Sequence, residues 1–188
     1  MRKPDQITVD RALLLYLLHL AESHGLMTDV KLQQLAFLCE LQMFDKRVKG
    51  FHFEFFRFAY GAFSKDLDND LLSLRRKGCL ENFDPSENAG GALTIFQEGV
   101  QKANTDVNSQ VMEILQAVTS TYGPQDTGGL SKAVEAVEVS TPEQPEFKLA
   151  IRDISFHTIL LVPHRIEVDG EFTLPRHVLA KINAALGY

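Results

Sequence analysis

The sequence contains no tryptophan, only two cysteines and no long hydrophobic run. Cys39 and Cys79 lie in helical contexts and not at loop spacings, which argues against a secreted disulfide framework and favours a reducing compartment. The longest apolar run, residues 12–20, is interrupted by Tyr16 and His19. It is shorter than the roughly 20 residues that a membrane-spanning helix needs. We therefore expect a cytoplasmic protein without a membrane partner.

Basic residues are fewer than acidic ones. The chain has 19 Lys and Arg against 25 Asp and Glu, a net charge of −6. Both parts are acidic, since residues 1–100 carry 12 basic and 14 acidic side chains and residues 101–188 carry 7 and 11. This balance disfavours nucleic acid as a partner, because affinity for phosphates comes mostly from Lys and Arg. With 45% hydrophobic and 23% charged residues, the chain is otherwise typical of a globular protein with a real core.

Recognisable catalytic motifs are also missing. The six histidines form no HxxxH pair and lie at no metal-ligand spacing with either cysteine. There is no P-loop, no GxGxxG after a strand and no GxSxG elbow. Asp66, Asp68 and Asp70 fall in the first turns of an expected helix, where negative charge complements the helix dipole. We expect no catalytic residue, metal or cofactor, and an enzyme whose site is assembled from distant segments is the least favoured hypothesis.

Phenylalanine is abundant and concentrated in one region. Seven of the 13 phenylalanines lie between Phe37 and Phe58. In residues 51–61, FHFEFFRFAYG, aromatic residues alternate as expected for a strand. Most of these rings suit a core, but six aromatic residues in ten positions exceed what one short strand usually buries. We therefore predict a protein-binding patch at the strand and the following turn, formed by Phe56, Arg57, Phe58, Tyr60 and Phe63.

The order of the predicted elements in the first part of the chain is winged-helix-like. A central helix is expected over 8–22, a second helix is capped by Thr28, and a third is capped by Ser64 and ends at Gly78. The third would be the recognition helix. Short strands are expected near 80–83 and over 92–96, with the turn-rich loop 84–91 between them as the wing.

The second part of the chain begins with a strong amphipathic helix, capped by Asn104 or Thr105 and ending at Tyr122. The remaining elements are expected in this order: a flexible connection over 123–131, at best a short helix over 131–139, a linker-like break over 141–146, a strand over 154–162, a type I′ hairpin at Asp169-Gly170, and a final helix after Pro175. We predict a mainly helical α+β fold. Residues 1–122 would form a winged-helix-like unit plus the amphipathic helix, and residues 123–188 a linker, short helix, β-hairpin and C-terminal helix packed on it.

A basic cluster leaves a second function open. Arg75, Arg76 and Lys77 end the third helix, where they complement its dipole, but together with Lys65 they are also candidates for DNA phosphate contacts. The alternative function is therefore a winged-helix transcriptional regulator. The three aspartates at the N-terminal part of that helix count against it, because a recognition helix usually presents this part to the bases.

Two stretches resemble a known family. KLQQLAFLCEL (31–41), followed by FEFFRFAYGAFSKDLDNDLLSLRRKGCLE (53–81), resembles the Panacea antitoxin domain, also called SocA-like, and the related YwgA-like bacterial proteins. These families have a KLQKL-type helix, an aromatic strand, and a YGP-[FY]-S turn into a helix that ends in a glycine. The resemblance covers about residues 8 to 145. The chain departs from the pattern at Ala62, where the family has proline, and residues after 146 have no counterpart.

The resemblance implies a non-enzymatic protein-interaction module. Panacea-type antitoxins lie beside varied toxins and neutralise them by protein contact. A domain with this composition could do so by burying aromatic side chains, with its charge steering the encounter. The expected partner is a toxin-like or other protein, and a homodimer is also compatible with the sequence.

Overall fold

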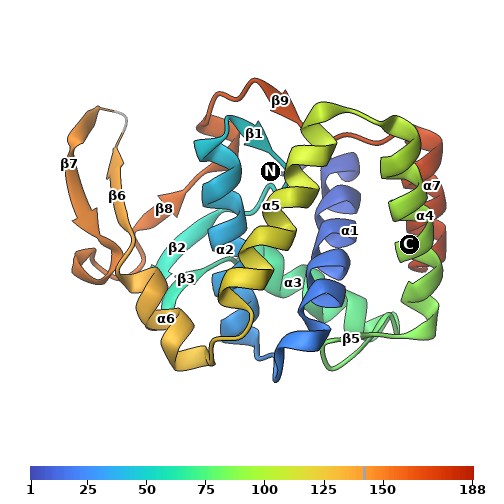
Figure 1. Ribbon diagram of the computed structural model, residues 1–188, viewed down its shortest axis with the longest axis horizontal. Coiled ribbons are helices and arrows are strands. Elements are labelled where there is room, and N and C mark those ends of the chain that lie inside the picture. Colours follow the sequence, from blue (N-terminus) through green and yellow to red (C-terminus); the bar gives the residue numbers. More distant parts are fainter. Residues whose placement is uncertain (142) are drawn as a thin grey trace.

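Helix α1 (Pro4–Ala21) runs through the middle of the molecule (Figure 1). Its leucines point in nearly every direction and are buried, which confirms the prediction of a central helix. The helix begins four residues earlier than expected, at Pro4, whose fixed φ suits a first helical position. Four helices pack against it: α2 (Asp29–Asp45), α4 (Glu87–Ala103), α5 (Asp106–Tyr122) and α7 (Arg176–Ala185).

The computed structural model describes residues 1–141 and 143–188. It is an α+β fold, 58% helical, with small sheets, a C-terminal hairpin and a final helix, as the sequence predicted. Of the described helices, none is both long enough and apolar enough to cross a membrane. Helix α6 (Thr127–Glu135) packs on α2, and α7 packs on α1 and α4.

Three predicted helix starts are confirmed by their caps. The Thr28 hydroxyl accepts a hydrogen bond from the Lys31 N–H at 3.1 Å, and that of Thr105 accepts one from the Asn108 N–H at 3.2 Å. Ser64 caps α3 (Lys65–Arg76) in the same way. Each cap satisfies an N–H that the first helical turn leaves free. At the other end of α3, Gly78 has φ +69°, the left-handed conformation expected there.

A three-stranded sheet lies beside α2. Its order is β3–β2–β8, with β2 (Phe55–Phe58) in the middle and β3 (Gly61–Phe63) and β8 (Ile159–Leu161) antiparallel to it. The predicted strand over 154–162 is thus shortened to three residues. The backbone turns just before them, because His157 has a positive φ of +66°. A long aromatic strand over 51–61 does not form either, since Phe51 and Phe53 precede β2 and are buried in the core.

The predicted wing and the strand over 92–96 are wrong. After a two-residue hairpin, β4 (Leu80–Glu81) and β5 (Asp84–Pro85), the chain enters α4. Ala89, Ala92, Leu93 and Phe96 are buried at helical spacing, so this segment has a helical core face despite its turn-forming residues.

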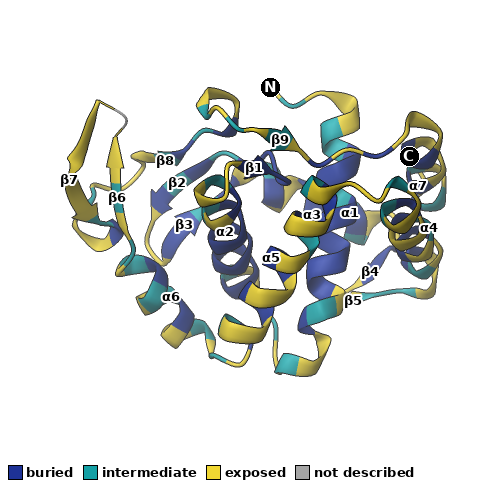
Figure 2. Ribbon diagram, turned by 45° about the horizontal axis from the view of Figure 1, so that its top comes forward, coloured by how far each residue is buried: buried dark blue, intermediate teal, exposed yellow. Residues whose placement is uncertain are grey.

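The C-terminal hairpin forms at a different place from the one predicted. It consists of β6 (Glu138–Thr141) and β7 (Gln144–Ala150), in the segment expected to be a short helix and a linker. At the Asp169-Gly170 turn, the short strand β9 (Gly170–Glu171) instead pairs in parallel with β1 (Val48–Lys49). Figure 2 shows the hairpin largely exposed, unlike the buried elements around α1.

Candidate functional site: an aromatic pocket beside the β2–β3 turn

The residues predicted to bind a partner lie on β2, the β2–β3 turn and β3. Phe56 pairs with Phe63 across the two strands, and Phe58 pairs with Gly61. Phe58 and Tyr60 are exposed, at 41% and 61%, whereas Phe56 and Phe63 are half-buried. The rings of Phe58 and Phe63 pack together, with 5.3 Å between their centroids.

Two glutamines of α2 hold this turn from the other side. The Gln34 side chain accepts a hydrogen bond from the Ala62 N–H at 3.0 Å and donates one to the Ala62 carbonyl at 2.9 Å. Gln33 does the same with the N–H and carbonyl of Ser64, at 2.8 and 3.1 Å. The two amides therefore make the backbone hydrogen bonds that a neighbouring strand would make at the free edge of β3. They satisfy backbone groups that would otherwise be buried without partners.

An apolar pocket of about 170 Å³ opens where these elements meet. We call it the aromatic pocket. Phe58, Tyr60 and Phe63 form its aromatic side, and Asp29 of α2 and Asp68 of α3 also belong to its lining. Its exposed wall is almost entirely apolar. The remaining lining residues are Val30, Gln33, Gln34 and Ala62. The clamped turn thus fixes one wall of the pocket, and the N-terminal ends of two helices fix the other.

Arg57 differs from its neighbours because it is buried, with 4% exposure. Its guanidinium donates hydrogen bonds to the carbonyls of Phe58 and Gly61 and forms an ion pair with Glu135 at 3.1 Å. It also lies 5.1 Å from the centroid of the Phe156 ring. The structure therefore places Arg57 behind the turn, where it supports the chain that carries Phe58 and Tyr60.

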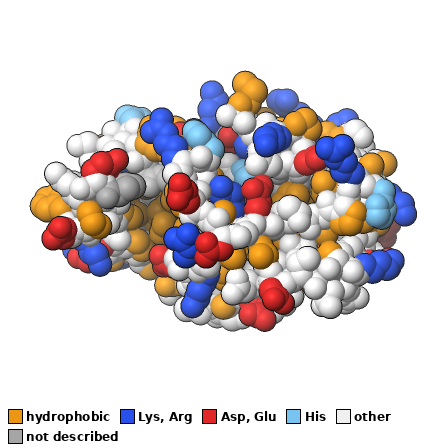
Figure 3. Space-filling view, turned by 90° about the horizontal axis from the view of Figure 1, so that it is seen from above, with side chains coloured by type: hydrophobic (Ala, Val, Ile, Leu, Met, Phe, Trp, Pro, Cys, Tyr) orange, Lys and Arg blue, Asp and Glu red, His pale blue; other side chains and the backbone are white. Residues whose placement is uncertain are grey.

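Exposed hydrophobic side chains gather at the end of the molecule that carries this pocket. Six of the ten large hydrophobic side chains exposed in the described chain lie on β2, the β2–β3 turn, β7, or beside and on β8. We call this set the apolar end: Phe58, Tyr60, Phe147, Leu149, Phe156 and Ile159. In Figure 1 these strands and the hairpin share one side of the molecule, and in the view from above (Figure 3) hydrophobic side chains show at the hairpin end.

The basic residues considered for DNA lie elsewhere, along α3. Arg75 donates to the Asn82 carbonyl at 2.9 Å and to Asp29 at 3.2 Å, and Lys77 donates to the Gly187 carbonyl at 2.5 Å. Lys65 and Arg76 are exposed at opposite ends of the helix. Two of the four cations are thus engaged within the chain, and the structure does not bring the four together.

Sequence reasoning missed a buried polar cluster outside the aromatic pocket. His52 lies between two carboxylates, with Nδ1 2.9 Å from Asp10 Oδ1 and Nε2 2.8 Å from Glu171 Oε1. An imidazole that donates from both ring nitrogens to two carboxylates is in its cationic form, and this arrangement favours that form. Burial lowers the pKa of His52, but its hydrogen bonds and charge interactions with Asp10 and Glu171 outweigh this effect and raise the pKa above its ordinary value.

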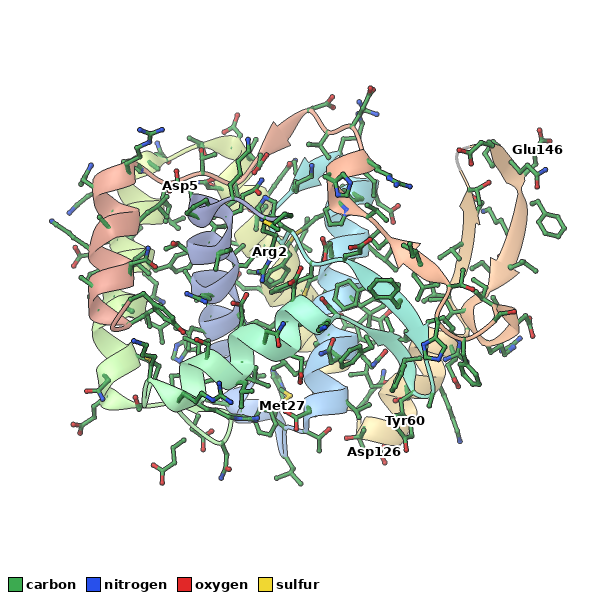
Figure 4. The ribbon with its side chains drawn as sticks, turned by 180° about the vertical axis from the view of Figure 1, so that it is seen from behind. Arg2, Asp5, Met27, Tyr60, Asp126 and Glu146 are labelled. Carbon is green, nitrogen blue, oxygen red and sulfur yellow. The ribbon has the colours of Figure 1, made fainter. Side chains whose placement is uncertain are left out.

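Two arginines complete this cluster. Arg2 donates to Asp10 at 2.8 Å and to Asp70 at 2.6 Å, and Arg11 donates to Asp70 at 3.0 Å. Figure 4 shows Arg2 lying against the interior, next to α1. No spacing rule could have revealed this set, because its members come from α1, the segment before β2, α3 and β9.

Glu40 lies in the same region, fully buried on α2, and neither carboxyl oxygen has a hydrogen-bond partner. Burial raises the pKa of Glu40 well above its ordinary value, and the charge of Asp10 raises it further, against the opposing charges of Lys49 and Arg2. Burial therefore disfavours the ionised form of this carboxyl.

The buried cluster has a structural role and does not form an open site. His52 is 8% exposed, and none of its residues lines the aromatic pocket. Within residues 1–141 and 143–188, no group of three or more His, Cys, Asp or Glu side chains is arranged to hold a metal ion. The cluster ties α1 to β9 and to the segment before β2, and so holds the C-terminal part of the chain against the N-terminal part.

Comparison with known proteins adds no relative to these observations. No protein-family model, no curated protein and no solved structure matches the chain.

Proposed function

We propose that this protein is a non-enzymatic interaction module that neutralises or adapts a partner protein by direct contact, in the manner of a Panacea-type antitoxin. The observation that carries the proposal is the aromatic pocket, in which exposed Phe58 and Tyr60 stand beside an apolar cavity within the apolar end. Well-packed pockets with aromatic anchors supply most of the binding energy in protein interfaces.

The charges around the pocket favour a partner segment of particular chemistry. Asp29, already paired with Arg75 at 3.2 Å, and Asp68, which forms no ion pair among the described residues, belong to the lining of the pocket, and the whole chain carries a net charge of −6. A partner that offers an apolar side chain next to Lys or Arg would bury the first in the pocket and place the second near Asp68. The overall negative charge would also speed the encounter with a basic partner.

The positions that resemble the antitoxin family support the proposal, because Gln33, Gln34, Tyr60 and Phe63 line the pocket. Gln33 holds Ser64, and the Lys31 ammonium donates to the Gly123 carbonyl at 2.6 Å, which ties α2 to the end of α5. Gly61 has φ +113°, and a Cβ there would contact the Gln34 amide oxygen, so the Tyr60-Gly61 pair needs its glycine. These residues therefore hold the turn that presents Tyr60.

The DNA-binding alternative has less support. Arg75 and Lys77 are engaged in contacts within the chain, and Asp66 and Asp68 occupy the first turn of α3. The expected wing is replaced by the start of α4. No observation favours this function over partner binding.

The test is co-expression with the product of the adjacent gene, using growth rescue and co-purification as readouts. We expect the wild-type chain to form a complex and rescue growth, and we expect the double variant Phe58→Ser/Tyr60→Ser to lose binding at least about ten-fold, as for interface anchors. Leu72→Ser is the matched control, since Leu72 is a similarly exposed hydrophobic residue outside the pocket.

Circular dichroism and thermal unfolding verify that the variants are folded. The proposal fails if the wild-type chain neither binds nor rescues, and it also fails if the folded double variant binds as tightly as the Leu72→Ser control.

A further inference from the structure

The β6–β7 hairpin projects from the body and presents an apolar side chain between two charges. Phe147 is 62% exposed, and Glu146 and Lys148 flank it. Because side chains alternate along a strand, Glu146 and Lys148 lie on one face of β7, while Phe147 and Leu149 lie on the other. The hairpin thus offers an aromatic ring on one face and a pair of opposite charges on the other.

The hairpin lacks the support that such a structure usually has. Its sheet contains only β6 and β7, so each strand has one edge without a strand partner among the described residues. Nearly every residue of both strands is exposed. A two-stranded hairpin is marginally stable in water unless it packs against another surface.

The helix beside the aromatic pocket carries matching charges: Asp68 lines the pocket, and Lys65, one turn earlier on α3, lies outside its lining. Lys65 and Asp68 lie three positions apart on α3, about 5–6 Å from each other on the helix surface. Residues two apart on a strand, such as Glu146 and Lys148, are separated by about 6.6 Å. Neither Lys65 nor Asp68 forms an ion pair within the described chain. A β7 strand laid along α3 therefore places Glu146 opposite Lys65, and Lys148 opposite Asp68.

The opposite face of the same strand would meet the aromatic wall of the pocket. With Glu146 and Lys148 turned toward α3, Phe147 points at Phe58 and Tyr60. In a single chain this contact does not form, since Tyr60 and the hairpin residue Glu146 lie far apart on the molecule (Figure 4). The hairpin that fills the pocket must come from another chain.

We propose that the occupant is a second copy of this chain, and that two copies form a two-fold symmetric dimer by exchanging their hairpins. Phe147 of each copy enters the aromatic pocket of the other, and the Glu146–Lys65 and Lys148–Asp68 pairs set the direction of the strand. Pocket and hairpin both belong to the same end of the molecule, as a self-complementary two-fold interface requires.

The inference goes beyond the proposed function, although it uses the same pocket. A partner protein that binds at Phe58 and Tyr60 competes with the second copy. The dimer is measured on the purified chain alone, so its presence or absence is independent of whether the adjacent gene product binds.

The experiment measures mass by sedimentation equilibrium over micromolar concentrations at low salt. The wild-type chain should be dimeric, and Phe147→Ser should weaken dimerisation at least about ten-fold, as expected for a buried aromatic anchor. Leu26→Ser, at an exposed position on the loop before α2, is the control and should remain dimeric.

A charge swap tests the partner and the register together. Lys148→Glu and Asp68→Lys should each weaken the dimer, because each puts like charges opposite one another. The double variant Lys148→Glu/Asp68→Lys restores opposite charges and should regain dimerisation. A monomeric wild type overturns the proposal, as does a dimer that Phe147→Ser leaves intact. A double variant no better than the single ones overturns the proposed register.

Discussion

Gln34 and Ala62 exchange two hydrogen bonds, although they lie on a helix and on the edge of a sheet. The Gln34 amide accepts from the Ala62 N–H and donates to its carbonyl, at 3.0 and 2.9 Å. Proline has no N–H and lysine has no acceptor, so neither Pro at position 62 nor Lys at position 34 could make this pair of hydrogen bonds.

This pairing predicts a coupled effect of two substitutions. Ala62→Pro removes the N–H that the buried Gln34 oxygen accepts, and we expect it to lower the free energy of unfolding by about 1–3 kcal/mol. Gln34→Lys should also destabilise the protein, since the Ala62 N–H then loses its acceptor. The loss of stability in the double variant should be smaller than the sum of the two single losses, and the difference should be about 0.5–3 kcal/mol. Urea unfolding measures all three, and strictly additive losses would contradict the pairing.

The hydrogen bonds between Gln33 and Ser64 predict a loss of stability on substitution that another glutamine of α2 should not show. Gln33→Ala leaves the buried N–H and carbonyl of Ser64 without partners, which should cost about 1–3 kcal/mol. Gln42→Ala on the same helix is the control, because Gln42 is exposed and should change stability by less than about 0.5 kcal/mol. Chemical denaturation of both variants tests this prediction. Equal changes in the free energy of unfolding would show that the Gln33–Ser64 hydrogen bonds contribute nothing to stability.

His52 predicts a stability difference that depends on pH. Its pKa is raised in the folded protein, so the charged imidazole stabilises the fold fully below its unfolded value of about 6.5. That contribution disappears as the pH rises through the higher, folded pKa. His52→Leu should lower the free energy of unfolding by about 2–3 kcal/mol near pH 6, because it removes hydrogen bonds between charged groups. The loss should be smaller at pH 9.

Unfolding curves at several pH values test this prediction, with the exposed His164→Asn as the control. A difference between wild type and His52→Leu that stays constant or grows from pH 6 to pH 9 would contradict it.

Glu40 predicts a stabilising substitution. Its buried carboxyl has no hydrogen-bond partner, and its pKa in the folded protein is raised well above 4.5. As the pH rises, Glu40 therefore ionises at a lower pH in the unfolded chain than in the folded protein, and this lowers the free energy of unfolding. Glu40→Leu removes this penalty and should stabilise the protein by about 1–3 kcal/mol at neutral pH, or about 2–4 °C in Tm for each kcal/mol.

Differential scanning fluorimetry measures the change, and the gain should be larger at pH 8 than at pH 5. Glu113→Leu, at an exposed position on α5, is the control. A lower Tm for Glu40→Leu would mean that the carboxylate is ionised and stabilised by Lys49 and Arg2.

Local physical rules were sufficient for α1, α2, α3, α5 and α7, but not for α4. The caps at Thr28, Ser64 and Thr105 lie where the sequence predicted them, and the leucines of α1 indicated a surrounded helix. They misled where turn-forming residues also fitted another structure. Residues 84–91 have the composition of a loop, but most of this segment lies in α4 because its apolar residues face the core.

The candidate site was predictable in part, from the concentration of aromatic residues. That excess located the turn, but it could not distinguish exposed Tyr60 from buried Arg57, because their burial depends on the contacts of Arg57 with Glu135 and Phe156. The Asp169-Gly170 turn shows the same limit. A hairpin is the locally favoured structure there, yet β9 pairs with β1, more than one hundred residues earlier.

The sequence by itself therefore determined five of the helices (α1, α2, α3, α5 and α7), the caps of α2, α3 and α5, and the aromatic character of the β2 region, since these depend on residues within a few positions of one another. Only the tertiary structure decided how distant groups meet. Gln34 holds Ala62 across 28 residues, and His52 joins Asp10 and Glu171 across 42 and 119 residues. Hydrogen bonds and ion pairs require partners within about 3 Å, and for residues so far apart in the chain that distance is set by the packing of the whole fold.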